Sequence, residues 1–175
     1  ITMLIQTRRP IASLTDYIDY YWYMDCPLPV TDWELSVPDG LIDLVVDLRE
    51  DTIRLADASQ RIGVFDSTVL FGPHSEHYFI KNSHASSVIG VRFKPGGAIP
   101  FVGVPMECLQ NKKLSMHDIW GNRMIDLRDE LLFAPTIENK FLVLDNRLSQ
   151  WAVKPFSVPP EVQFALKELT EISSN

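Results

Sequence analysis

The stretch VIGVRFKPGGAIPFVGVP, residues 88–105, separates two halves of the chain that differ in pattern. Its beginning alternates large apolar side chains with glycine and arginine, which predicts a half-buried β-strand. The segment KPGG, residues 94–97, ends that strand, because proline lacks an N–H donor and glycine adopts backbone angles that other residues resist. We therefore predict a structural role for Gly96 and Gly97, at a tight corner that leads into a short helical turn at residues 98–102. The Gly-Lys-Ser/Thr that completes a phosphate-binding loop is missing after this corner.

The residues before this stretch predict a series of short β-strands. The clearest is LIDLVVDL, residues 41–48, which has one wholly apolar side and one mixed side. The aromatic-rich strand DYIDYYWYM, residues 16–24, is expected to turn Ile18, Trp22 and Met24 toward the core. Further strands are predicted for residues 33–37, 52–55, 61–65, 68–71 and 77–80. Short strands at intervals of roughly 8–12 residues are typical of a β-sandwich or barrel and not of βαβ units.

Beyond residue 105 the spacing of apolar residues becomes helical. One predicted helical face consists of Ile119, Trp120, Met124, Leu127 and Leu131. Gly121 interrupts this pattern and is expected to kink or split the helix. Residues 137–151 have apolar side chains at spacings of three and four, so we expect a second helix that forms an antiparallel pair with the first against the β-structure. The segment PFSVPP, residues 155–160, reads as a linker before a final helix at residues 161–172.

Composition limits the classes of function. With 175 residues, 46% hydrophobic and 22% charged, the chain is long enough to form a packed core. Its net charge of −7 argues against direct binding to nucleic acid. No apolar run reaches the ~18 residues of a membrane span, and the N-terminus lacks the pattern of a secretory signal, so we expect a cytoplasmic protein without membrane contact. Cys26 and Cys108 are two free thiols or one disulfide, and the sequence does not decide between them.

The order and spacing of these motifs resemble the N-terminal domain of bacterial AraC-type transcription regulators. Besides residues 88–105, the resemblance rests on PDGLIDLVVDL, residues 38–48, and on Tyr21-Trp22, and it extends from about residue 10 to residue 151.

This resemblance implies an α+β fold in which a cupin-like antiparallel β-barrel or sandwich, residues 10–95, precedes an antiparallel helical part, residues 97–152. It further implies that residues 1–154 form an N-terminal regulatory domain, for effector sensing, for dimerisation or for both, and that residues 155–175 lead toward a helix-turn-helix domain that this chain does not contain. The implied partners are an unknown small-molecule effector, a second copy in a possible homodimer, and DNA only through the absent domain.

The histidines and cysteines do not form a recognisable catalytic or metal-binding motif. On a strand, His74 and His77 would point to opposite faces, while a metal needs convergent ligands. His84 and His117 have no ligand partners nearby in the sequence. We therefore expect no metal, no cofactor and no catalytic residue. The alternative is a cupin-like metal-binding protein or enzyme.

Arg92 is the most informative single side chain, because it is a charged residue on an otherwise apolar strand. We favour an ion pair with Asp43 or Asp47, which lie on the mixed side of the strand at residues 41–48. The alternative is that Arg92 binds an anionic effector. We predict a ligand site formed by Trp22, Phe71 and Arg92, although aromatic side chains of this kind also fill cores.

Overall fold

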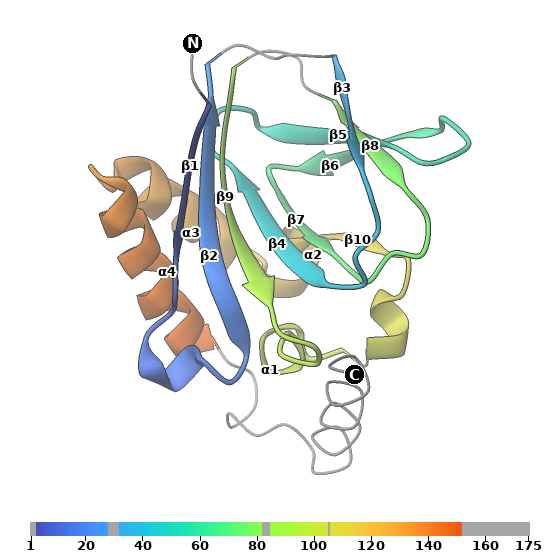
Figure 1. Ribbon diagram of the computed structural model, residues 1–175. Coiled ribbons are helices and arrows are strands. Elements are labelled where there is room, and N and C mark those ends of the chain that lie inside the picture. Colours follow the sequence, from blue (N-terminus) through green and yellow to red (C-terminus); the bar gives the residue numbers. More distant parts are fainter. Residues whose placement is uncertain (1–2, 28–31, 82–84, 105, 152–175) are drawn as a thin grey trace, which may run out of the picture.

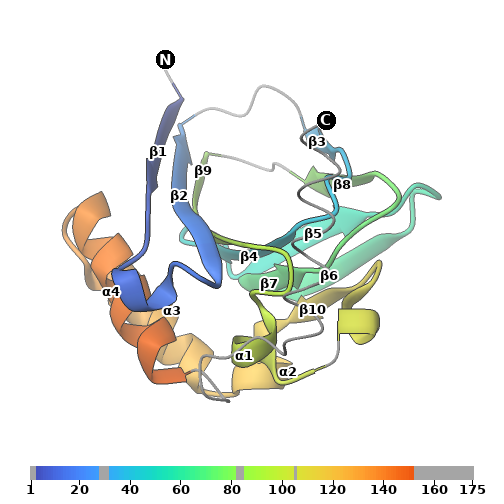
Figure 2. The ribbon, with the colours of Figure 1, turned by 60° about the horizontal axis from the view of Figure 1, so that its bottom comes forward.

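The structure, a computed structural model, describes residues 3–27, 32–81, 85–104 and 106–151. Two antiparallel β-sheets face each other, and helices α3 and α4 lie outside the larger sheet (Figures 1 and 2). The predicted fold class, α+β with antiparallel β-structure followed by a helical part, is confirmed. The predicted linker at residues 155–160, the final helix at residues 161–172 and His84 lie outside the described residues.

The larger sheet has six strands in the order β1-β2-β9-β4-β7-β10, and every neighbouring pair is antiparallel. Its strands are β1 (Leu4–Arg8), β2 (Ile18–Cys26), β9 (Ser86–Phe93), β4 (Ile42–Asp47), β7 (Thr68–Phe71) and β10 (Lys113–Ser115). The edge strands β1 and β10 were not predicted and lie outside the range of residues 10–95 expected for the β-structure. Both are short and polar at several positions, so they lack the apolar alternation that identifies a strand.

The smaller sheet has four strands in the order β3-β8-β5-β6 and is also antiparallel throughout. Its strands are β3 (Trp33–Ser36), β8 (Tyr78–Lys81), β5 (Thr52–Ala56) and β6 (Ile62–Asp66). All four agree with predicted strands to within a few residues. The two sheets thus form a sandwich whose strands come from the first part of the chain, apart from β10.

The helices follow β9. They are α1 (Ile99–Val102), α2 (Met116–Trp120), α3 (Arg123–Phe133) and α4 (Ile137–Trp151), with a 3₁₀ turn, η2 (Met106–Leu109), after α1. A further 3₁₀ turn, η1 (Ala12–Leu14), lies between β1 and β2. Gly121, at φ 58°, separates α2 from α3. Of the two outcomes predicted at this glycine, a kink or a split, the structure therefore has the split into two helices. The helices α3 and α4 run antiparallel beside β1 and β2 (Figure 1), as predicted.

The main hydrophobic core lies between the outer face of the six-stranded sheet and the helices. The apolar side of β4, with Ile42, Leu44 and Val46, belongs to this core. The expected orientation of β2 was wrong for Trp22 and Met24, which are only partly buried and face the other way. The pairing of β2 with β9 is irregular between Ile18 and Tyr20, and this shift of phase puts Tyr21 and Tyr23 on the core side together with Ile18.

The corner after β9 explains both glycines of the KPGG segment. Gly96 has φ 75°, a left-handed conformation that glycine adopts without strain. A Cβ atom on Gly97 would lie 2.0 Å from the carbonyl oxygen of Tyr17, so only glycine fits against this backbone. The Lys94 N–H donates to the same carbonyl at 2.9 Å. The corner therefore fixes the end of β9 on the segment that precedes β2.

None of the helices in the described part of the chain has the length and apolar character needed to cross a membrane. Cys26 and Cys108 are not joined to each other by a disulfide, which resolves the alternative left open by the sequence.

Candidate functional site: the cavity between the sheets

A cavity of about 510 Å³ lies between the inner faces of the two sheets. That volume is within the range of small-molecule sites in proteins, ~300–1,000 Å³. Both sheets contribute to its wall: Trp22 and Val45 come from the larger sheet, and Tyr78 and Ile80 from the smaller one. Because the core packs on the outer face of the larger sheet, its inner face is free to line this space.

Trp22 and Phe71, two of the three residues predicted to bind a ligand, line the cavity. Trp22 pairs with Gly90 across β2 and β9, and a Cβ atom on Gly90 would lie 2.1 to 2.5 Å from three atoms of the indole ring. The missing side chain at Gly90 therefore makes room for the indole to lie flat on β9. Phe71 stacks on Tyr78, with the ring centroids 5.3 Å apart. The wall thus presents aromatic surface from both sheets.

Arg92, the third predicted residue, is held in an ion pair and is not among the lining residues. Its Nε donates to one Asp43 oxygen at 3.0 Å and its Nη2 to the other at 2.5 Å, and Asp39 lies 3.0 Å from the same Nη2. The hydrogen bond to Asp43 is the main cause that raises the pKa of Arg92 further above its usual value. The structural pair that we favoured from the sequence is therefore present, and two carboxylates occupy the guanidinium.

Asp47, the other partner proposed for Arg92, does not contact it. In the register of the sheet, Asp43 is opposite Arg92, whereas Asp47 is opposite Val88. The Asp47 Oδ1 accepts the N–H groups of Arg49 and Glu50, each at 2.8 Å. Burial raises the pKa of the Asp47 carboxyl. Asp43 and Asp47 both line the cavity, but toward different ends of β4.

The segment that follows Asp47 connects the cavity to the helices. Arg128, on α3, donates from Nε to the Asp47 carbonyl at 2.9 Å and from Nη2 to the Glu50 carbonyl at 3.1 Å, and it pairs with Asp51 at 2.9 Å. Asp47 and Glu50 also line the cavity. One side chain of the helical layer therefore holds part of the cavity wall in place.

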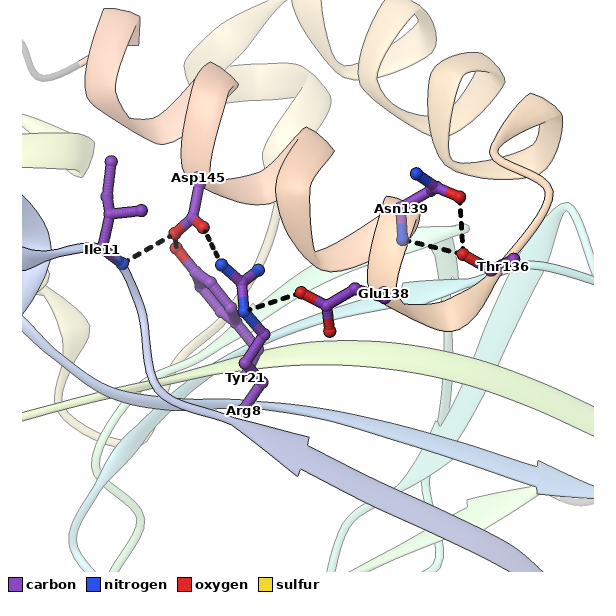
Figure 3. A network of polar contacts seen from close by, with 7 residues as sticks. All are labelled: Arg8, Ile11, Tyr21, Thr136, Glu138, Asn139 and Asp145. Carbon is purple, nitrogen blue, oxygen red and sulfur yellow. Dashed lines mark hydrogen bonds and ion pairs between the residues drawn. The ribbon is translucent and has the colours of Figure 1, made fainter.

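A second junction ties the helices to the start of the sheet (Figure 3). Asp145, on α4, is only 1% exposed, and it accepts hydrogen bonds from Arg8 Nη2 at 2.6 Å, Tyr21 Oη at 2.8 Å and the Ile11 N–H at 3.1 Å. Arg8 also pairs with Glu138, on the first turn of α4, at 3.2 Å. Burial, and next the neighbouring Asp145, raise the pKa of Tyr21. This network anchors α4 to both β1 and β2.

His74 takes no part in these contacts and lies beside Tyr78. Its Nε2 is buried without a hydrogen-bond partner, and its ring centroid lies 5.0 Å from that of Tyr78. Burial, together with the charge of Lys113, lowers the pKa of His74 to about 4. In the described ranges, no three His, Cys, Asp or Glu side chains converge in a way that would hold a metal ion.

Sequence reasoning missed Arg128 and Asp145. Each is a charged residue within an otherwise ordinary amphipathic helix, and its partners lie 77 to 137 positions away along the chain. Asp145 did offer a signal, because it lies next to Leu144 on the buried face of α4, where a carboxylate needs partners.

No curated protein sequence matches the chain. Solved structures similar to part of it include the Cupin_2 domain of an XRE-family transcriptional regulator from Enterobacter cloacae, with 15% identity, 53% of this chain and 97% of that chain covered, and a TM-score of 0.37. A cupin domain from Bordetella pertussis Tohama I has 10% identity, 53% and 93% coverage and a TM-score of 0.35. The Co(II) form of HppE has 11% identity, 52% and 53% coverage and a TM-score of 0.38.

One family model, DUF6597, described as a domain of unknown function, matches residues 6–115. The match begins in β1, ends with β10 and so spans both sheets and the cavity between them. Because it covers more than half of the sequence, the chain belongs to the DUF6597 family.

Proposed function

We propose that this chain is the effector-sensing domain of a cytoplasmic AraC-type transcription regulator, and that it controls DNA binding by a helix-turn-helix domain elsewhere in the protein. The AraC-type assignment is supported by the sequence resemblance of residues 10–151. The sensing role is carried by one structural observation, a ligand-sized cavity whose wall is hydrogen-bonded to the helical layer through Arg128.

The contacts of Arg128 provide a route by which a ligand in the cavity would change the arrangement of the helices. A ligand that contacts Asp47 or Glu50 favours one position of the segment between them, and Arg128 transmits that preference to α3. The helix pair then responds as a unit, because Glu130 of α3 forms a two-point ion pair with Arg147 of α4. A ligand shifts such an equilibrium only by its difference in affinity for the two arrangements. The segment that resembles the lead-in to the DNA-binding half follows α4 in the sequence.

A thermal-shift screen of metabolites tests the proposal, because any ligand that prefers the native state raises the unfolding temperature. Hits are repeated on Val45→Trp, which fills the cavity, and on Val64→Trp, which places the same side chain on an exposed position of β6. The proposal expects Val45→Trp to abolish the shift and Val64→Trp to retain it. A full-length protein whose DNA affinity is the same with and without a confirmed cavity ligand would contradict it, and sedimentation of the same samples reports whether the ligand changes a monomer–homodimer equilibrium.

The alternative, a cupin-like metal-binding protein or enzyme, draws on His74, whose Nε2 lacks a partner and whose pKa of about 4 leaves the imidazole neutral at pH 7. Metal analysis of the purified chain separates the two hypotheses. A stoichiometric transition metal that is lost on His74→Ala favours the alternative. A metal content that this substitution leaves unchanged assigns His74 to packing against Tyr78.

A further inference from the structure

The charged groups around the cavity are unevenly paired. Asp43 is matched by Arg92 at one end of β4. Asp47, toward the other end, forms no ion pair with any described residue, and only its Oδ1 accepts hydrogen bonds, both from backbone N–H groups. Its Oδ2 is left without a donor in the described part of the chain. A carboxylate that is partly withdrawn from water in this way retains an unmet preference for a positive charge.

Four basic side chains lie in the cavity wall or in contact with the segment that follows Asp47. Arg49 pairs with Asp25 at 3.4 Å, and Arg128 binds Asp51 and two backbone carbonyls. Lys81 lines the cavity as well, and its ammonium lies over the Trp33 ring, 5.1 Å from the centroid. Arg54, on β5, also lines the cavity, but it is exposed and forms no ion pair with Asp47 in the described part of the chain. None of these four side chains forms an ion pair with the Asp47 carboxylate, although the charge of Arg128 partly offsets the effect of burial on its pKa.

The aromatic rings of the cavity wall also favour a positively charged ligand. The faces of aromatic rings attract cations, and two rings are already used by the protein's own cations: Lys113 lies 4.4 Å from the centroid of Tyr78 and Arg92 lies 5.9 Å from that of Tyr20. Of the three aromatic rings that line the cavity, Tyr78 has Lys113 over it, whereas no described cation lies over Trp22 or Phe71.

We propose that the cavity binds an organic cation, a protonated amine or a quaternary ammonium group on an aromatic or aliphatic body, with its positive charge beside Asp47 and its apolar part against Trp22 and Phe71. This inference rests on the proposed sensing function and names the chemical class of the effector. An anionic effector at Arg92, the alternative considered from the sequence, would have to displace two carboxylates from that guanidinium.

Two probes of matched shape and opposite charge test the ligand class. Phenethylamine and hydrocinnamate share a phenyl ring and a two-carbon spacer, and benzyltrimethylammonium tests a quaternary group. Calorimetric titration into the purified chain is expected to show binding of the two cations and at least about tenfold weaker binding of the anion, as expected when one charge-assisted contact is replaced by a repulsion. Tighter binding of hydrocinnamate, or binding of none of the three at millimolar concentration, overturns the proposal.

The role of Asp47 is tested separately. Asp47→Asn keeps the Oδ1 acceptor for the two backbone N–H groups but removes the charge, so it is expected to weaken phenethylamine binding about tenfold. Asp51→Asn is the matched control, since Asp51 lies in the same segment but is exposed and does not line the cavity. It is expected to change the affinity by about twofold or less. Equal losses in both variants contradict the assignment, and if Asp47→Asn fails to fold, the comparison of the three probes on the unaltered chain still decides it.

Failure of this inference is distinguishable from failure of the proposed function. A neutral or anionic metabolite whose thermal shift is lost in Val45→Trp would refute the organic cation and leave the sensing role intact. If no cavity ligand changes the affinity for DNA, the sensing role is refuted, whatever the charge of the ligand.

Discussion

Replacement of Asp145 is predicted to lower the free energy of unfolding. Its carboxylate is buried and accepts hydrogen bonds from Arg8, Tyr21 and the Ile11 backbone, so it joins α4 to β1 and β2 (Figure 3). In Asp145→Asn the side-chain oxygen still accepts from Tyr21 and Ile11. The amide nitrogen, however, replaces the oxygen that Arg8 binds, so two donors face each other and the guanidinium loses its buried counter-charge.

The magnitude follows from the exposure of the two partners. Removal of one partner from a buried ion pair typically costs ~3–5 kcal/mol. The Arg8 side chain is 22% exposed and keeps Glu138 at 3.2 Å, so it is partly compensated. We therefore expect Asp145→Asn to lower the free energy of unfolding by about 2–3 kcal/mol. With a typical dependence on urea for a small protein, this is a decrease of ~1 M in the midpoint of unfolding.

Urea denaturation followed by circular dichroism measures this change, and a double-mutant cycle with Arg8→Met assigns it. Once the guanidinium is gone, the amide at position 145 no longer opposes a charge, so the double variant should lose ~1–3 kcal/mol less than the sum of the single losses. Glu138→Gln is the control, because an exposed partner of the same arginine is expected to matter by less than ~1 kcal/mol. A loss below ~1 kcal/mol for Asp145→Asn, or additive single losses, would refute the reasoning.

Three further predictions concern the corner, the link to α3 and a buried imidazole. Gly97→Ala brings a Cβ atom to 2.0 Å from the Tyr17 carbonyl and is expected to destabilise the chain by ~1–3 kcal/mol in the same denaturation assay; an unchanged midpoint would contradict this clash. Arg128→Met frees the Asp47 and Glu50 carbonyls, so hydrogen exchange should accelerate in the segment between them, and unchanged protection there would refute the link. Burial lowers the pKa of His74 from 6.5 to about 4, so the unfolded state takes up a proton that the folded state does not. The free energy of unfolding should therefore decrease as the pH is lowered from about 6.5 to about 4. After allowance for its partial exposure we expect a loss of ~1–2 kcal/mol that His74→Asn does not show, and parallel pH profiles would exclude His74 as the cause.

Much of the fold could be predicted from the sequence, because local patterns determine local structure. The alternation in β4 and β9 identified both strands, the glycines at the corner after β9 marked the change to helices, and Gly121 marked a break. The pair formed by Arg92 and Asp43 was also accessible, since a charge on a mostly apolar strand needs a partner on a neighbouring strand.

What could not be predicted depended on contacts between distant segments. The phase of β2 is set by an irregularity in its pairing with β9, which no pattern within β2 reveals, and so the inward and outward sides were exchanged at Trp22. The choice of Asp43 over Asp47 as the partner of Arg92 depends on the register of β4 against β9, and a shift of the register would have changed it. Arg128 and Asp145 bind groups in other elements, so their roles follow only from the packing of the helices.

The position of the core explains why a charged cavity is compatible with stability in this fold. In many β-sandwiches the space between the sheets is the core and must be filled. Here the apolar side of β4 and the core side of β2 are buried against α3, α4 and the residues around α1, so the largest burial of apolar surface lies outside the sandwich. A smaller cluster around Ile53 and Phe71 holds the two sheets together. The remaining inner surface is therefore free to keep Asp47 and an open volume, and helices that supply the stability also contact the cavity wall through Arg128. A ligand that orders that wall would act on the layer that holds the protein together, which is the physical basis for proposing that this cavity reports to the rest of a regulator.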